Sequence, residues 1–257
     1  MIKIQRLNLD NSWFLQINEL RLLIDPWLEG TEVDFFSWFN TQWHRTKPLS
    51  FQDVPEFDAV LITQKYPDHF HKETLKKLQP QKVIAPSSIQ KALKKILPEA
   101  EIVGMSKAEP ELEFLGTTFT FLPTSRKIDP IYDAFMLESE GERVFLATHG
   151  FHPNTEQISF MKKGPGCEVL ITPFNEYRLP ALLGGTVSPG IENVKELVDI
   201  LKPKHVFATH DEDKHATGLV SKFAKITWAK SEKELRQISW LADRYQNLNH
   251  YNQITLS

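Results

Sequence analysis

Three histidines of this sequence each come after a short apolar run. The run AVLIT (residues 59–63) is followed by QKYPDHFH, which contains His69, while RVFLAT is followed by His149 and HVFAT by His210. These runs are too short for helices and rich in β-branched residues, which indicates strands buried on both faces. In layered α/β folds the loops beyond such strands meet at one edge of the sheet, where ligand sites form. We therefore expect the three histidines to lie near a common site.

Asp68 precedes His69 and adds a carboxylate to the histidines. Imidazole and carboxylate groups are the usual protein ligands of zinc, iron, manganese and nickel, so Asp68, His69, His149 and His210 form a predicted metal centre. Such an ion lowers the pKa of a bound water towards about 7, which makes a hydroxide nucleophile available at neutral pH. Four protein ligands would fill a tetrahedral ion, so hydrolysis requires five-coordination or a ligand that moves away.

The strands that would carry these residues fall into two patterns. The first 25 residues hold three short runs with loose alternation, in which Trp13, Leu15 and Ile17 share a face, and this predicts an antiparallel start. Residues 111–142 are expected to form strands with a hairpin turn at Glu140-Gly141. Strand and helix alternate in much of the remainder. This order of strands and helices predicts two sheets with helices packed on their outer faces.

The predicted helices have recognisable starts. Ser88 precedes an apolar pattern over 89–97, and His71 begins the helical stretch HKETLKKL. Ser188 and Pro189 are expected to be the cap and first turn of a helix continuing to Leu201. Ser231 and Glu234 have the spacing of a capping box.

An aromatic segment between residues 34 and 45 has no clean period. It contains Phe35, Phe36, Trp38, Phe39 and Trp43, and we expect a long loop. A flap over the core is the favoured interpretation. A substrate lid and a membrane or subunit contact are the alternatives.

The composition narrows the class of protein. With 257 residues, 41% hydrophobic and 25% charged, and without a linker or internal repeat, the chain is expected to be one domain over 1–257. No apolar run approaches the roughly 20 residues of a spanning helix, and no signal peptide is evident, which favours a cytoplasmic protein without stable membrane anchoring. The net charge of −3 provides no general attraction for nucleic acid, so a small-molecule substrate is expected. The single cysteine, Cys167, is predicted to be a buried structural thiol.

Several motifs resemble the metallo-β-lactamase fold superfamily. Its hallmark is H-x-H-x-D-H after a buried strand, and AVLIT-QKYPDH resembles it. Three further segments are similar in the same order, namely LLIDP at 22–26, RVFLATHG and KPKHVFATH. The resemblance implies an α/β (α+β) fold, a four-layer αββα sandwich with one or two metal ions at its edge, and commonly a hydrolase.

The sequence departs from the family's pattern at one of the two metal sites. Gln64 and Tyr66 occupy the positions of the first two motif histidines, and FLPTSRK has no histidine where a later ligand would be sought. The other ligand set matches Asp68, His69 and His210, and His149 stands at the position of a bridging aspartate. The resemblance therefore implies a mononuclear site.

Other residues near this site receive roles by the same resemblance. Asp25 is expected to orient the metal loop by hydrogen bonding, and Gln64 and Tyr66 to border the cavity. The Tyr66 hydroxyl could polarise a substrate oxygen or simply fill the vacated site, and both remain open. His71 is a candidate for contact with metal or substrate. Arg126 is a candidate for binding an anionic group, although a solvated surface position is favoured.

The favoured function is a metal-dependent hydrolase with one divalent ion, zinc before iron, manganese or nickel. A metal-bound hydroxide would attack an ester, amide, thioester or phosphoester, with Tyr66 and Asp68 as the catalytic residues and Asp68 serving also as a metal ligand. A serine nucleophile elbow, a P-loop and a dinucleotide-binding motif are all missing from the sequence. The alternative is a non-catalytic scaffold that binds a small molecule or a protein.

Overall fold

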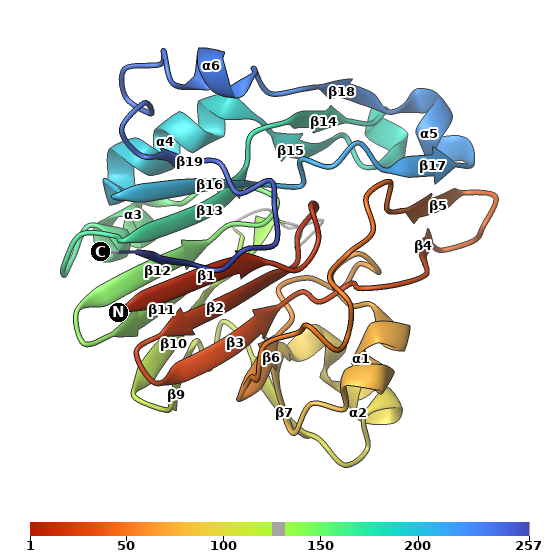
Figure 1. Cartoon of the computed structure of the whole chain (residues 1–257), viewed down its shortest axis with the longest axis horizontal. Helices are drawn as coiled ribbons and strands as arrows, with labels where there is room; N and C mark the ends of the chain where they lie inside the picture. The colour runs from red at the N-terminus through yellow and green to blue at the C-terminus, as the bar shows by residue number, and fades with distance from the viewer. Residues whose placement is uncertain (125–131, 257) are drawn as a thin grey trace.

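The computed structural model describes residues 1–124 and 132–256, so the candidate Arg126 lies outside the described residues. Two seven-stranded sheets pack face to face (Figure 1). The first has the order β20 (Ile254–Leu256), β1 (Ile2–Arg6), β2 (Trp13–Ile17), β3 (Leu20–Ile24), β6 (Ala59–Leu61), β7 (Lys82–Pro86), β8 (Glu101–Met105). The second has the order β19 (Tyr245–Gln246), β16 (His205–Thr209), β13 (Val169–Pro173), β12 (Glu142–Leu146), β11 (Ala134–Ser139), β10 (Thr117–Leu122), β9 (Glu111–Phe114).

Each sheet is antiparallel on one side and parallel on the other. Strands β20, β1, β2 and β3 pair antiparallel, which confirms the predicted start, whereas β3, β6, β7 and β8 pair parallel. In the second sheet β9, β10, β11 and β12 pair antiparallel, with the predicted turn at Glu140-Gly141 between β11 and β12, and β12, β13, β16 and β19 pair parallel. The carboxyl ends of the parallel strands consequently meet at one edge of the sandwich.

The main core lies between the two sheets. Trp13, Leu15 and Ile17 of β2 all point into it, as the alternation predicts, and the second sheet contributes large apolar side chains that include Phe119, Phe135 and Phe207. Trp13 meets Phe207 edge-on at a centroid distance of 5.9 Å. Because strands buried on both faces need cover outside as well, each sheet also has an outer apolar layer.

Helices form those outer layers. Leu75 of α1 (Lys72–Leu78) and Leu93 of α2 (Gln90–Ile96) pack against the first sheet. Leu197 of α4 (Ile191–Leu201) packs against the second, where α3 (Thr155–Met161) contributes Met161. Figure 1 shows these helices outside the two sheets. The predicted four-layer αββα sandwich is confirmed.

Two of the predicted helix starts are wrong. Ser188 and Pro189 belong to β15 (Thr186–Pro189), Gly190 precedes α4, and the Ser188 hydroxyl donates to the carbonyl of Asn175 instead. At the Ser88 start, a 3₁₀ turn, η1 (Ser87–Ile89), leads into α2 without a side-chain cap. The capping box at Ser231 is present at the start of α6 (Glu232–Leu235).

The aromatic segment is a hairpin and does not cover the core, so both parts of that prediction are wrong. Strands β4 (Thr31–Asp34) and β5 (Asn40–Trp43) pair antiparallel, and β17 (His215–Thr217) adds to β5. Figure 1 shows this unit extending beyond the sandwich edge. Phe35, Phe36 and Trp38 at its tip are 77%, 59% and 65% exposed. Phe36 and Trp38 stack on each other at 5.7 Å, which shields part of each ring.

A second small sheet faces this hairpin. It consists of β15, β14 (Glu176–Arg178) and β18 (Lys225–Thr227), and it is connected through η3 (Ala181–Leu183). The short helix α5 (Leu219–Phe223) follows β17 and donates backbone hydrogen bonds from Leu219 and Val220 to Trp38 and Phe39. The hairpin tip is thereby held by a segment 181 residues later in the chain.

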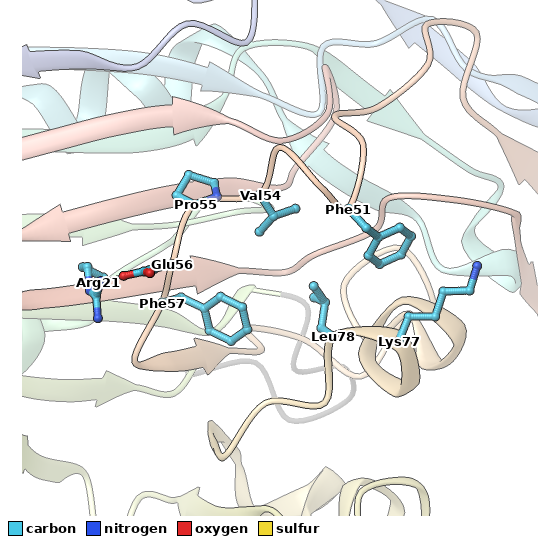
Figure 2. Close-up of a pocket in the computed structure, with 8 residues that line it drawn as sticks. All are labelled: Arg21, Phe51, Val54, Pro55, Glu56, Phe57, Lys77 and Leu78. Carbon is cyan, nitrogen blue, oxygen red and sulfur yellow. Dashed lines mark hydrogen bonds and ion pairs between the residues drawn. The ribbon is translucent and has the colours of Figure 1, made fainter.

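A shallow hollow lies elsewhere on the surface, between the loop at residues 51–57 and the end of α1 (Figure 2). Phe51, Val54, Phe57 and Leu78 line it, and Arg21 at one end binds Glu56 at 2.7 Å. It shares no lining residue with the cavity at the sandwich edge described below.

Two single features complete the comparison with the sequence. Cys167 is buried as predicted, and burial raises the pKa of its thiol to about 12, so the thiol stays protonated at neutral pH. Among residues 1–124 and 132–256, no helix is both long and apolar enough to cross a bilayer.

We expect Gly218→Ala to destabilise the fold more than Gly116→Ala. Both glycines have positive φ, +107° and +68°, which costs an alanine about 1–3 kcal/mol, and the cost is higher at Gly218 because its backbone lies outside the left-handed region. A Cβ at Gly218 would also lie 2.7 Å from the carbonyl oxygen of Phe39, whereas none of the described atoms lies within 4 Å of one at Gly116. Urea unfolding should show an additional loss of about 1–3 kcal/mol at Gly218. Equal losses would contradict the proposed close packing of α5 on the hairpin.

Candidate metal centre

His69 is fixed in the core by a hydrogen-bonded aspartate. Asp25, directly after β3, has a left-handed backbone (φ +46°), and its Oδ2 atom lies 2.7 Å from His69 Nδ1. The same carboxylate accepts from Thr63 N at 2.7 Å and from Thr63 Oγ1 at 2.5 Å. Because the Nδ1 atom of His69 is hydrogen-bonded to Asp25, the ring is held with its Nε2 atom facing away from Asp25.

His149 reaches the same point from the second sheet. It follows β12, and the preceding Thr148 hydroxyl lies 3.0 Å from that of Thr63, which joins the two strand ends. The Nε2 atoms of His149 and His69 are 2.9 Å apart. Two nitrogens bound to one ion at 2.0–2.1 Å lie about 3 Å apart, so this spacing suits a shared metal.

His210 approaches from β16. Its backbone is left-handed (φ +52°), its amide donates to the carbonyl of Asp10 at 2.8 Å, and its Nδ1 atom lies 3.3 Å from Asp10 Oδ1. The ring stacks beside that of His149 at a centroid distance of 4.6 Å. Its Nε2 atom is buried and has no hydrogen-bond partner among the described residues. A buried nitrogen without a partner is costly, and a metal ion would satisfy it.

Asp68 completes the group. Its Oδ2 atom lies 3.7 Å from His69 Nε2 and 3.9 Å from His210 Nδ1. One ligand atom from each of Asp68, His69, His149 and His210 can be chosen so that all lie within 4.8 Å of one another. The ends of β12 and β16 and the loop after β6 therefore bring together a donor set of three imidazoles and one carboxylate that could hold a metal ion.

The charges around the group keep its histidines in different states. Burial lowers the pKa of His149 well below its ordinary value, and neighbouring His210 and His69 lower it further, so this imidazole is neutral and able to ligate. Burial alone would lower the pKa of His69, but Asp68 and Asp25 raise it above its ordinary value. A metal ion bound to Nε2 of His69 would displace the proton that this atom carries when the imidazole is charged.

A half-buried lysine balances the carboxylates. Lys214 Nζ lies 2.7 Å from Asp10 Oδ2 and 4.0 Å from Asp68 Oδ2. Burial would lower the pKa of Lys214, but Asp10, Asp68 and Glu32 raise it above its ordinary value, so the ammonium remains charged. Burial would raise the pKa of Asp10, but Lys214 and His210 hold it well below its ordinary value.

The other predicted residues are placed differently from one another. Tyr66 lines the cavity that borders the group. Gln64 is buried, donates from Nε2 to the carbonyl of Asp133 at 3.4 Å, and does not line that cavity. His71 caps α1 through Thr74 and approaches the carbonyl of Thr31, so it is not brought to the group.

The sequence interpretation missed Asp10, Glu32 and Lys214. Asp10 lies in a short polar loop, and Lys214 follows Asp211, Glu212 and Asp213 in a stretch that is typical of a solvated surface. A ligating histidine usually donates to a carboxylate, which could have prompted a search for a partner of His210. Nothing in the linear order identifies Asp10 as that partner.

The group opens onto a cavity of about 620 Å³ at the sandwich edge. Asp68, His149 and His210 form part of its wall, and the β4–β5 hairpin, β14 and α5 are among the elements that contribute other lining residues. Gly184, in the segment between β14 and β15, also lines the cavity. A cavity of this size can hold a small molecule next to the donor set.

Comparison with known proteins agrees with this architecture. The family described as the β-lactamase superfamily domain matches residues 8–210, a range that runs from the Asp10 loop to His210. The chain belongs to the β-lactamase superfamily. Its fold is the metallo-β-lactamase type, with a degenerate H-x-H-x-D-H motif, as the sequence predicts. No curated protein sequence matches the chain.

Solved structures share this superfamily fold at low sequence identity. The isothiocyanate hydrolase from Delia radicum gut bacteria has a TM-score of 0.71 and 16% identity, with 99% of each chain covered. A possible metal-dependent hydrolase from Veillonella parvula DSM 2008 has a TM-score of 0.70 and 17% identity over 99% of this chain and 98% of that one. CmlA, a diiron β-hydroxylase from Streptomyces venezuelae, has a TM-score of 0.71 and 15% identity over 99% of this chain. This chain spans about half of CmlA's length, 54%.

We expect Asp25→Asn to weaken zinc binding by about 10–100-fold. An asparagine NH₂ group facing His69 would favour the tautomer with its proton on Nε2, the atom that faces His149. Competition with a chromogenic chelator measures the affinity, and Asp58→Asn, which alters a carboxylate bound to Arg21, is the control. Equal zinc affinity in wild type and Asp25→Asn would contradict this role of Asp25.

Proposed function

We propose that this protein is a metal-dependent hydrolase with one divalent ion held by Asp68, His69, His149 and His210. The observation that carries the proposal is the convergence of these four side chains, with a buried His210 Nε2 atom that has no partner among the described residues. Zinc is the proposed ion because three imidazoles and a carboxylate suit it, with iron, manganese or nickel as alternatives. The hydrolases among similar folds support the same class of reaction.

The mononuclear state is proposed from the donor atoms. Gln64, at a motif position where the superfamily has a histidine, points its amide at a backbone carbonyl and not into the cavity. Among residues 1–124 and 132–256, the four-residue group is the one cluster of histidine, cysteine and acidic side chains with metal-binding spacing. One ion would therefore have to perform the chemistry.

A bound divalent ion supplies Lewis acidity, which activates both water and the group under attack. The substrate is proposed to be an ester, amide, thioester or phosphoester that enters the cavity beside Asp68. Tyr66 lines this cavity, and we assign its hydroxyl a contact with the substrate oxygen. Asp68 also lines the cavity, so its carboxylate would be placed to accept a proton from a water molecule that attacks the substrate.

The metal assignment is tested by elemental analysis of protein purified without chelator. About one equivalent per chain is expected in wild type, and almost none in His210→Ala or Asp68→Ala, because each removes one of four ligands. His205→Ala is the matched control, since His205 begins the strand β16 that His210 follows. Normal metal content in His210→Ala, or two equivalents in wild type, would contradict the mononuclear site.

Activity is tested with nitrophenyl esters, thioesters and phosphoesters. Turnover should disappear with a chelator, return with zinc, and fall at least tenfold in Tyr66→Phe if the hydroxyl contacts the reacting oxygen. Retained metal without hydrolysis of any substrate would favour the alternative, a scaffold that binds its ligand without reaction.

A further inference from the structure

The walls of the cavity carry an excess of negative charge. Its acidic lining residues are Asp10, Glu32, Asp34, Asp68, Glu212 and Asp213, and its strong bases are Arg45 and Lys214. Most of these acids already have partners. Lys214 binds Asp10 at 2.7 Å, Arg45 binds Asp213 at 3.1 Å, and Asp68 belongs to the metal group.

Glu212 is also satisfied. One of its oxygens lies 2.6 Å from His44 Nδ1, and the other accepts from the backbone amides of Arg45 and Thr46. Glu32 and Asp34 are therefore the acidic wall residues without an ion pair among the described residues. They are two positions apart on β4, so their side chains leave the strand on the same side.

Glu32 is the more unusual of the two. It is 2% exposed, and its buried Oε2 atom has no hydrogen-bond partner among the described residues. Burial raises the pKa of this carboxyl well above its ordinary value, and repulsion from Asp68 adds to the effect, while the ammonium of Lys214 opposes it without forming an ion pair. Asp34 at least accepts a hydrogen bond from Asn40 at 2.8 Å. A buried carboxylate that makes no direct ion pair is costly, and a bound cation would favour the charged form of Glu32.

Aromatic rings line the cavity together with these carboxyl groups. Phe39, Tyr177 and Trp228 all contribute to its wall. Burial raises the pKa of Tyr177 to about 12, Lys214 opposes this, and Glu32 and Asp34 add to the increase, which places the phenol within their field. Aromatic faces next to carboxylates attract organic cations. A small metal ion would require several converging ligand atoms, and Glu32 is not part of the described metal-binding group.

We propose that this cavity binds an organic cation, a quaternary or protonated amine carried by the substrate, with Glu32 as its principal counter-ion and Asp34 as the second. The rings of Tyr177 and Trp228 cover its apolar surface. The inference rests on the proposed function in taking the cavity as the substrate site, and it names the substrate class as a cationic ester, amide, thioester or phosphoester. Without the Glu32 carboxylate the cavity would keep its shape but would lose its preference for a cationic ligand over a neutral one.

Choline and its neutral isostere 3,3-dimethylbutan-1-ol test the proposal. Isothermal titration of the metal-loaded protein at constant ionic strength should show choline binding at least tenfold tighter. Glu32→Gln should remove this difference, and Asp34→Asn should reduce it. Glu113→Gln is the matched control, because Glu113 is an exposed glutamate on strand β9 that does not line the cavity. Circular dichroism and metal content establish that each variant is folded and loaded.

Equal binding of choline and the alcohol by wild type would overturn the proposal. Unchanged choline affinity in Glu32→Gln would also overturn it, and if that variant does not fold, unchanged affinity in Asp34→Asn has the same consequence. Failure of the proposed function is recognised separately. A protein that retains no metal but still prefers choline is not a metal-dependent hydrolase, whereas one that hydrolyses neutral and cationic esters equally lacks the cation site.

Discussion

The edge of this sandwich depends on the hydrogen bonds that converge on the carboxylate of Asp25. That carboxylate is fully buried, and it accepts from the backbone and hydroxyl of Thr63 and from the ring of His69. A buried carboxylate is tolerable only when its oxygens are well satisfied, so the end of β3 and the loop after β6 must keep this arrangement. The contact between Thr63 and Thr148 extends it to the second sheet.

A second carboxylate and imidazole pair acts in parallel on the opposite side of the donor group. Asp10 lies beside His210 as Asp25 lies beside His69, but Asp10 also binds the ammonium of Lys214. Lys214 lies over the ring of Trp27 at 5.3 Å, which helps to hold it in a largely buried position. The imidazoles of His69 and His210 are thus oriented by aspartates that follow strands of the first sheet, although His210 itself follows a strand of the second sheet. The donor group therefore requires the two sheets to pack in this position relative to each other.

The sequence predicted the parts of this structure that depend on local pattern. Short β-branched runs gave strands, and the polar residues after three of them, His69, His149 and His210, lie together because parallel strands end at one edge. The hairpin at 31–43 was not predicted because the aromatic residues at its tip do not alternate with polar ones. The predicted helix cap at Ser188 was wrong because Ser188 lies in β15, where its hydroxyl donates to the carbonyl of Asn175. Lys214 looks like a surface lysine in sequence, and only the fold encloses it among carboxylates.

The two proposals are connected through charge. The superfamily resemblance assigns two metal positions to this edge, and in this chain Gln64 and Tyr66 replace ligands of one of them. If the site holds one ion, as proposed, it has two positive charges fewer than a dinuclear site, while Glu32 and Asp34 remain on the cavity wall without ion-pair partners among the described residues. In an enclosed site of low dielectric constant such a change is not screened well, so it shifts the potential towards attraction of cations. A substrate that carries its own positive charge would then restore the balance next to the single ion. The aromatic walls would favour an organic cation over a hydrated inorganic one, because only the former can exchange its solvent for ring faces.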